Sequence, residues 1–167
     1  MMVNDSEPLK AAVITVSDSC ARRERQDLSG PAVVKVLEKH GFHIVAEATI
    51  PDETVTIQNT LFRLSQKANV VVTTGGTGIS ARDVTPEATR TVCERLLDGV
   101  AEKMRMEGSK KTPFAALSRG VCGVRGRAVI LNLPGSPAGA EESLQSVVEL
   151  LPHIVQLLSG NTEHPQN

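Results

Sequence analysis

Four short apolar runs, rich in β-branched residues, divide the chain at regular intervals. They cover residues 11–16, 42–50, 70–74 and 127–133, and a polar or glycine- and proline-containing segment follows each of them. Nearly continuous apolar runs of this length are typical of strands that are buried on both faces of a parallel sheet. We therefore expect four strands.

Between these runs, apolar residues recur every three or four positions, as they do in amphipathic helices. The first expected helix opens at Gly30-Pro31 and ends at Gly41, and the second follows Asp52 or Thr54 and includes Ile57, Leu61 and Leu64. The third begins at Thr85-Pro86-Glu87 and reaches Leu97. The fourth covers 100–106, and the last runs from 141 to 158 with a bend at Pro152. Residues 112–123 are expected to be irregular or short-helical. Strands that alternate with helices predict an α/β fold, a three-layer α/β/α sandwich around a mostly parallel, doubly wound sheet.

The chain length of 167 residues suits one domain. We place this domain at residues 11–159, between a flexible N-terminal lead (1–10) and a flexible tail (160–167). No apolar run approaches membrane-spanning length, and the N-terminus lacks the order of a signal peptide. The protein is therefore expected to be cytoplasmic, with no membrane partner.

The charge balance and the scarcity of aromatic residues narrow the classes of partner. Lys plus Arg number 18 against 19 Asp plus Glu, so a bound phosphate must be held by local geometry rather than by a broad positive field. The chain has no Trp or Tyr and three Phe, which argues against nucleic-acid binding because bases commonly stack on aromatic rings. Cys20, Cys93 and Cys122 lack zinc-site spacing and are expected to be reduced thiols.

Four polar loops follow the four expected strands. They are Ser17-Asp18-Ser19, Pro51-Asp52-Glu53, Gly75-Gly76-Thr77-Gly78 with Arg82-Asp83, and Pro134-Gly135-Ser136-Pro137. In a parallel sheet these loops gather at one edge, where ligands of doubly wound folds bind. Their convergence predicts the binding site.

The glycine-rich third loop can approach a ligand closely, because glycine lacks Cβ and tolerates positive φ. Its N–H groups can form a nest for phosphate oxygens, with hydroxyl donors from Thr74 and Thr77. It matches neither the P-loop nor the dinucleotide-binding motif, and a plain strand-to-helix turn is the alternative. The PGSP segment (134–137) has the same two interpretations, a cradle for a polar ring or phosphate and a rigid turn.

Asp83 lies beside the expected phosphate nest, which is unfavourable unless a cation lies between them. Mg²⁺ takes one or two carboxylates together with phosphate oxygens, and Asp52 from the neighbouring strand is the natural second carboxylate. The alternative is that Asp52 and Asp83 are simple helix N-caps. Lys110-Lys111 is a further candidate for a substrate phosphate, although exposed lysines usually have no specific role.

Seven ordered motifs resemble the MogA-like molybdopterin-binding domains, most of all the G domain of gephyrin and its plant counterpart. They are TVSDS (15–19), DLSGP (27–31), IPDE (50–53), TTGGTG (73–78), RDVTPEAT (82–89), TPFAALSR (112–119) and ILNLPGSP (130–137). The resemblance implies a homotrimer in molybdenum cofactor biosynthesis that transfers AMP from Mg-ATP to molybdopterin, with pyrophosphate released. It places the two essential aspartates on Asp52 and Asp83.

The resemblance also locates substrate contacts. It places nucleotide and molybdopterin contacts on the glycine loop (Thr74, Gly75, Gly76, Thr77, Gly78), on Ser118, and on Pro134, Gly135, Ser136 and Pro137. The convergence of the strand-end loops adds Ser17 and Asp18 of the first loop as expected contacts. One departure is Gly108 followed by Ser109, where active relatives tend to carry Ser. No second, larger domain is found, so a separate protein is expected to insert molybdenum. A non-catalytic molybdopterin carrier or a trimeric scaffold is the alternative function.

Overall fold

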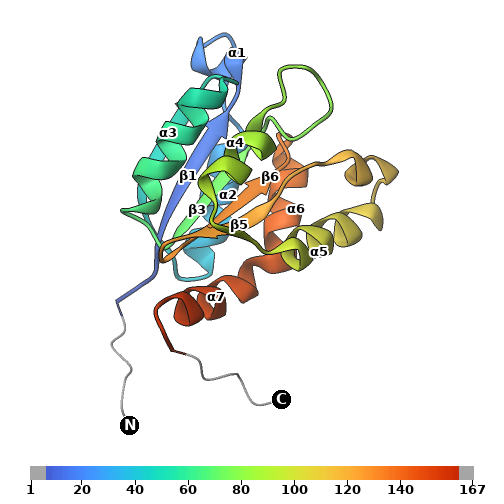
Figure 1. The fold of residues 1–167 in the computed structure, drawn as a ribbon. Helices are drawn as coiled ribbons and strands as arrows, with labels where there is room; N and C mark the ends of the chain where they lie inside the picture. The colour runs from blue at the N-terminus through green and yellow to red at the C-terminus, as the bar shows by residue number, and fades with distance from the viewer. Residues whose placement is uncertain (1–6, 162–167) are drawn as a thin grey trace.

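One six-stranded sheet with helices on both faces forms the body of the protein in the computed structural model, which describes residues 7–161 (Figure 1). The strands are β1 (Lys10–Val16), β2 (His43–Ile50), β3 (Val70–Thr74), β4 (Arg95–Leu96), β5 (Cys122–Arg125) and β6 (Ala128–Leu133). Their order in the sheet is β2-β1-β3-β6-β5-β4. The first four strands in this order are parallel, whereas β5 and β4 pair antiparallel at one edge.

The helices connect the strands as expected for a doubly wound fold. They are α1 (Asp18–Ala21), α2 (Ser29–Lys39), α3 (Thr54–Ser65), α4 (Thr85–Val92), α5 (Asp98–Ser109), α6 (Pro137–Val147) and α7 (Leu151–Leu158), with 3-10 turns η1 (Pro113–Leu117) and η2 (Val148–Leu150). Within residues 7–161, no helix is both long enough and apolar enough to cross a bilayer. The three-layer α/β/α sandwich and the mostly parallel sheet are confirmed.

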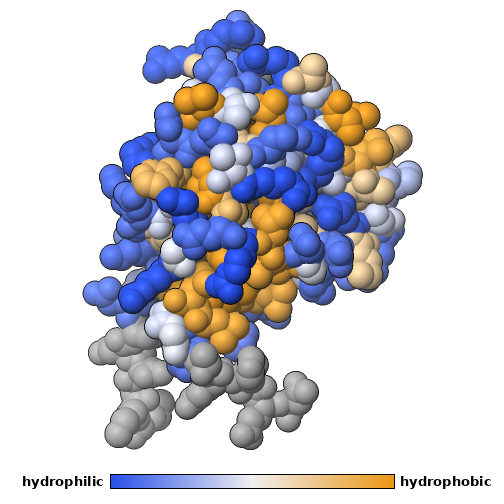
Figure 2. All heavy atoms as spheres, viewed as in Figure 1, coloured by the Kyte–Doolittle hydropathy of each residue, from blue (hydrophilic) through white to orange (hydrophobic). Residues whose placement is uncertain are grey.

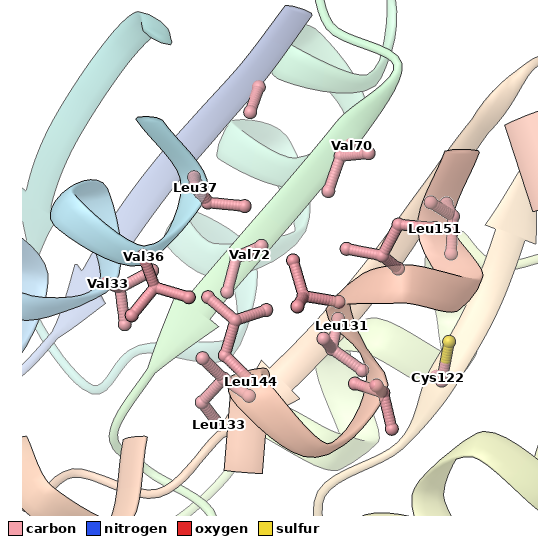
Figure 3. Packing of buried hydrophobic residues seen from close by; sticks show 14 of the residues in the cluster. Val33, Val36, Leu37, Val70, Val72, Cys122, Leu131, Leu133, Leu144 and Leu151 are labelled. Carbon is pink, nitrogen blue, oxygen red and sulfur yellow. The ribbon is translucent and has the colours of Figure 1, made fainter. Parts of the chain in front are cut away.

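Alternate residues of the central strands supply the two halves of the core, because successive side chains of a strand point to opposite faces. On one face, Val70, Val72 and Leu131 pack against α2, α5, α6 and α7. Figure 3 shows this packing, with Val33 and Leu37 of α2 directed at the strands. Burial on both faces explains why the central strands are mostly apolar.

The opposite face of the sheet packs against α3 and α4. Ile14, Val71 and Ile130 are fully buried there, against Ile57 and Leu61 of α3. Both helix layers are therefore anchored to the same three central strands, β1, β3 and β6. This arrangement fixes the carboxyl ends of those strands, and the loops that follow them, relative to one another.

The sequence prediction was wrong for the antiparallel edge. The helix that was expected to extend from Thr85 to Leu97 ends at Val92, because Cys93 adopts an extended conformation and Arg95–Leu96 pairs with β5. Cys122–Arg125 is a strand, although this region was expected to be irregular or short-helical. These elements have two and four residues, too few to display a clear period.

The two ends of the chain also differ in detail from the prediction. The final helix is divided by the 3-10 turn η2, and Pro152 lies in the first turn of α7 rather than within one bent helix. Strand β1 already begins at Lys10. The expected flexible segments, 1–10 and 160–167, lie mostly outside the described residues, so they stay a prediction.

Candidate functional site

A cavity of about 330 Å³ opens at the carboxyl edge of the sheet, beside the ends of β1 and β3. These two strands are neighbours in the sheet, and the later strands lie to either side of them, with β2 next to β1 and β6 next to β3. This is the switch point at which doubly wound folds bind ligands. The cavity is lined by Thr15, Val16, Ser17, Cys20, Arg25, Gln26, Asp27, Leu28, Ser29, Asp52, Thr74, Gly75, Gly76, Asp83, Gly135, Ser136 and Pro137.

Two glycines at the end of β3 bring the loops together. Gly75 and Gly76 have φ values of +92° and +68°, a conformation that side-chain-bearing residues rarely adopt. A Cβ on Gly75 would collide with the carbonyl oxygen of Val16, and a Cβ on Gly135 would lie 3.3 Å from the Gly75 Cα. The loops after β1, β3 and β6 therefore meet at backbone distance, and the glycines make this approach possible.

Asp52 is tied to the first loop by a reciprocal pair of hydrogen bonds. The Asp18 amide donates to Asp52 Oδ2 at 2.9 Å, and the Asp52 amide donates to Asp18 Oδ1 at 3.0 Å. Burial raises the pKa of Asp52, and the like charges of Asp18 and Asp83 act in the same direction against the lowering effect of the Asp18 amide. Glu53 is the N-cap of α3 and makes no side-chain cap, so the N-cap interpretation of Asp52 is wrong for α3.

Asp18 forms an ion pair with the neighbouring Arg82. Arg82 donates from Nε to Asp18 Oδ2 at 3.0 Å and from Nη2 to both carboxylate oxygens at 2.8 and 2.9 Å. The hydrogen bond to Arg82 lowers the pKa of Asp18, so this carboxylate is ionised at neutral pH. Asp18 does not line the cavity, and its side chain links the first loop to the loop that carries Asp83. A substrate contact by Asp18 stays a prediction.

Asp83 lines the same cavity as Asp52. Its Oδ2 accepts a hydrogen bond from the Ser80 amide at 3.0 Å. The N-cap of α4 is Val84, without a side-chain cap, so the N-cap interpretation of Asp83 is wrong for α4. The two aspartates that the sequence paired are thus brought to one site.

The residues at this site fit a magnesium ion that is shared with a phosphate ligand. Among the described residues, no group of three or more Asp, Glu, His or Cys could hold a metal ion on its own. Mg²⁺ needs only one or two carboxylates when phosphates supply the other oxygens. A Cβ on Gly76 would lie 3.1 Å from Asp52 Oδ1, and a Cβ on Gly78 would lie 2.8 Å from Asp83 Oδ2, so the glycines leave space at both carboxylates.

A buried hydroxyl adds to this fit. Within residues 7–161, the Thr85 Oγ1 atom is buried and has no hydrogen-bond partner. It lies next to Gly76, and a Cβ at that position would collide with it. An unsatisfied polar atom of this kind is unusual in a protein interior, and a bound water or ion is one explanation for it.

The remaining predicted residues divide into two groups. Ser17, Thr74, Gly75, Gly76, Gly135, Ser136 and Pro137 line the cavity, whereas Thr77, Gly78, Ser118 and Pro134 do not. Ser118 and Pro134 border a separate small cavity of about 30 Å³ instead. Ser136 also caps α6 by accepting a hydrogen bond from the Gly139 amide at 3.1 Å.

The predicted lysine pair lies away from the cavity. Lys110 pairs with Glu107 at 2.9 Å and Lys111 pairs with Glu142 at 2.9 Å. Neither lysine lines the cavity at the sheet edge, so the structure does not bring them to the expected phosphate site.

The segment from Arg25 to Ser29 was missed as a wall of the cavity. It folds back over the strand ends because Asp27 accepts hydrogen bonds from Thr15 Oγ1 at 2.7 Å and from the Gly30 amide at 3.0 Å. Ser29 Oγ lies 2.9 Å from Thr74 Oγ1, which joins this segment to β3. The DLSGP motif (27–31) was the available signal, although it carries no periodicity that reveals the fold-back.

The comparisons with known proteins agree with this architecture. Residues 12–153 match the family model described as "Probable molybdopterin binding domain". The molybdopterin adenylyltransferase of Helicobacter pylori is 38% identical over 162 residues, which cover 93% of this chain and 90% of that protein. The crystal structure of the molybdopterin biosynthesis enzyme MoaB from Thermus thermophilus has a TM-score of 0.85 and 47% identity, over 91% of this chain and 97% of that one.

A longer relative contains the same unit. The molybdenum cofactor synthesis protein cinnamon of Drosophila melanogaster is 40% identical over 158 residues, and the match covers 93% of this chain but only 26% of cinnamon. The match to the family model spans most of the chain and its whole sheet except the first two residues of β1. The chain therefore belongs to the family of molybdopterin-binding domains that includes the MogA and MoaB proteins.

Proposed function

We propose that this protein is a molybdopterin adenylyltransferase, which transfers AMP from Mg-ATP to molybdopterin and releases pyrophosphate in molybdenum cofactor biosynthesis. The observation that carries the proposal is that Asp52 and Asp83 line one cavity beside the glycines of the β3 loop. The names of relatives that align over nearly their whole length support it as well.

The charge of the cavity supports the role of a divalent ion. Arg25 is the one basic residue in its lining, against Asp27, Asp52 and Asp83. A triphosphate would be repelled by this surface, whereas a bound Mg²⁺ ion would supply the missing positive charge. Asp52 and Asp83 would hold the ion, and the ion would offset the charge of the departing pyrophosphate.

Positioning is the main task of the chain in such a transfer. The terminal phosphate of molybdopterin is already a nucleophile at neutral pH, so its oxygen can attack the α-phosphorus of ATP without a strong base. The bond from this phosphorus to the bridging oxygen of pyrophosphate breaks as the new bond forms. The Gly75 amide already donates a hydrogen bond to the Leu133 carbonyl at 3.1 Å. We therefore assign the phosphate nest to the amides from Gly76 onward, with Ser17 and Ser136 at its sides.

The direct test is pyrophosphate release that depends on both Mg-ATP and molybdopterin. Asp83→Ala should abolish this release while molybdopterin binding stays close to that of the unaltered protein. Asp98→Ala, which removes an exposed carboxylate at the start of α5, is the matched control and should leave turnover unchanged. Normal turnover by Asp83→Ala would exclude Asp83 from the chemistry. Molybdopterin binding without any pyrophosphate release in the unaltered protein would support a carrier or scaffold.

The assembly and the cellular setting of the protein are part of the same proposal. We propose a cytoplasmic homotrimer that passes its product to a separate molybdenum-inserting protein, as the resemblance to MogA-like proteins implies. Exposed apolar side chains on α5 and η1 (Met106, Phe114 and Leu117) are the kind of surface that subunit contacts cover. Figure 2 shows apolar side chains on the right-hand side of the molecule, where Figure 1 places the segment after α5. Sedimentation equilibrium would measure the subunit number.

A further inference from the structure

Arg119 lies two residues after the end of η1 and holds the loop between β3 and α4 through several hydrogen bonds. Its amide donates to the Thr77 carbonyl at 2.9 Å. Its guanidinium donates from Nε to the Gly78 carbonyl at 2.8 Å and from Nη2 to the Asp83 carbonyl at 2.8 Å, and Nη1 forms an ion pair with Glu87. The side chain thus joins both sides of the exposed part of the loop and the helix that follows.

The loop has little else to keep it in place. Residues 79–82 are exposed, and Ile79, the apolar residue at the tip of the loop, is 73% exposed. Inside the loop, Ser80 and Asp83 bond to each other, which closes a turn but does not attach it to the body of the protein. The Arg82–Asp18 pair also attaches the loop, but through the exposed Arg82 side chain and not through the backbone of Asp83. Arg119 is the side chain that binds the Asp83 backbone itself.

We propose that Arg119 is a positioning residue, which holds the backbone of Asp83 so that its carboxylate can meet a divalent ion together with Asp52. The inference rests on the proposed adenylyl transfer. A planar guanidinium can bind two carbonyl oxygens at fixed angles, whereas a lysine ammonium acts as a single point of charge. The same backbone segment carries Ser118, so the clamp also links the loop of Asp83 to the small cavity that Ser118 borders.

Arg119→Lys keeps the charge near Glu87 but cannot hold the Gly78 and Asp83 carbonyls together. We expect amide hydrogen exchange of residues 78–84 to rise by about tenfold or more, which corresponds to the loss of one or two hydrogen bonds to a charged group. The affinity for Mn²⁺, measured by electron paramagnetic resonance in the presence of ATP, should fall by a similar factor. The variant should remain folded at the temperature of the assay, and the KM for molybdopterin should change little.

Glu87→Gln is the matched control, because it removes the ion pair and leaves both carbonyl contacts of Arg119 intact. It should resemble the unaltered protein in amide exchange and in Mn²⁺ affinity. A second variant, Arg119→Ala, should lose Mn²⁺ affinity and regain much of it when methylguanidinium is added, because the added cation can occupy the vacated position.

Unchanged exchange and unchanged Mn²⁺ affinity in Arg119→Lys would overturn the inference. Loss of Mn²⁺ affinity in a folded Arg119→Ala variant without any recovery in methylguanidinium would also count against it. These outcomes are separate from a failure of the proposed function. If the unaltered protein releases no pyrophosphate, adenylyl transfer is refuted, while the exchange and Mn²⁺ measurements still report whether Arg119 positions Asp83.

Discussion

A single buried amide behind the candidate site connects four parts of the chain, and its removal tests whether that connection stabilises the fold. Asn132 of β6 is 1% exposed. Its Nδ2 donates to the hydroxyl oxygens of Thr73 and Thr89, each at 3.0 Å, and its Oδ1 accepts from the Val121 amide at 3.2 Å. These bonds join β6 to β3, to α4 and to the residue before β5.

The expected cost of Asn132→Ala follows from these three bonds. A buried hydrogen bond contributes about 1 kcal/mol, and a buried donor that loses its partner costs about 1–3 kcal/mol. The Val121 amide has no water to replace the lost oxygen, since it is buried. We therefore expect the free energy of unfolding to fall by about 3 kcal/mol. In a domain of this size that loss lowers the melting temperature by about 6–12 °C.

Urea unfolding at a fixed protein concentration measures this loss, and a double-mutant cycle tests its origin. Thr73→Val removes one of the three bonds and should cost about 1 kcal/mol. The double variant should be less destabilised than the sum of the single variants by about 1 kcal/mol, because the Asn132–Thr73 bond is then counted once. A loss below about 1 kcal/mol in Asn132→Ala, or strict additivity in the cycle, would refute the reasoning.

Two further predictions concern the cavity itself. Gly75→Ala should lower the free energy of unfolding in urea by at least about 1–2 kcal/mol, because Gly75 has a φ of +92° and a methyl group would also collide with β1. Gly126 has a φ of +55° and open space around it, so Gly126→Ala should have the conformational cost alone. Equal losses of unfolding free energy in the two variants would show that the collision does not contribute. Burial raises the pKa of Cys93 to about 11 and that of Cys122 to about 12, so both stay neutral thiols at pH 8. Cys20 should therefore be the one cysteine that reacts quickly with Ellman's reagent. Because Cys20 lines the cavity, Mg-ATP should slow that reaction, and rapid labelling of all three cysteines would contradict the prediction.

The sequence predicted the parallel part of the fold because burial on both faces leaves a strong signal. Strands β1, β3 and β6 are buried along nearly their whole length, so each gives a continuous apolar run. The antiparallel edge leaves no such signal. The apolar pair Leu96–Leu97 continued the helical period of α4, and only pairing with β5, which is distant in sequence, pulls Arg95 and Leu96 into the sheet.

The candidate site was predicted to the extent that strand ends determine it. Asp52, Gly75 and Ser136 lie within three residues of the ends of their strands, so a parallel sheet places them at one edge whatever the details of the loops. The wall formed by residues 25–29 depends instead on a carboxylate that bonds back across twelve residues, from Asp27 to Thr15. A bond of this kind is set by the shape of the loop, and no local pattern of polar and apolar residues encodes it.

The structure also separates the aspartates of the site by their hydrogen bonds. Four of them lie near the sheet edge. Asp18 has both oxygens bonded to Arg82, and Asp27 has both oxygens bonded to Thr15, Ser29 and Gly30. Within the described residues, Asp52 and Asp83 each have one oxygen bonded to a backbone amide, of Asp18 and of Ser80, and no donor on the other.

This difference bears directly on where a cation can bind. A carboxylate whose oxygens are saturated by protein donors has little capacity left for a metal ion, whereas a carboxylate that is oriented by one amide presents its second oxygen in a fixed direction. Asp18 and Asp27 therefore act as structural links, and Asp52 and Asp83 keep the free oxygens that a shared divalent ion requires. The distribution of hydrogen bonds favours this pair over any other pair at the site, independently of the sequence pattern and of the resemblance that pointed to it.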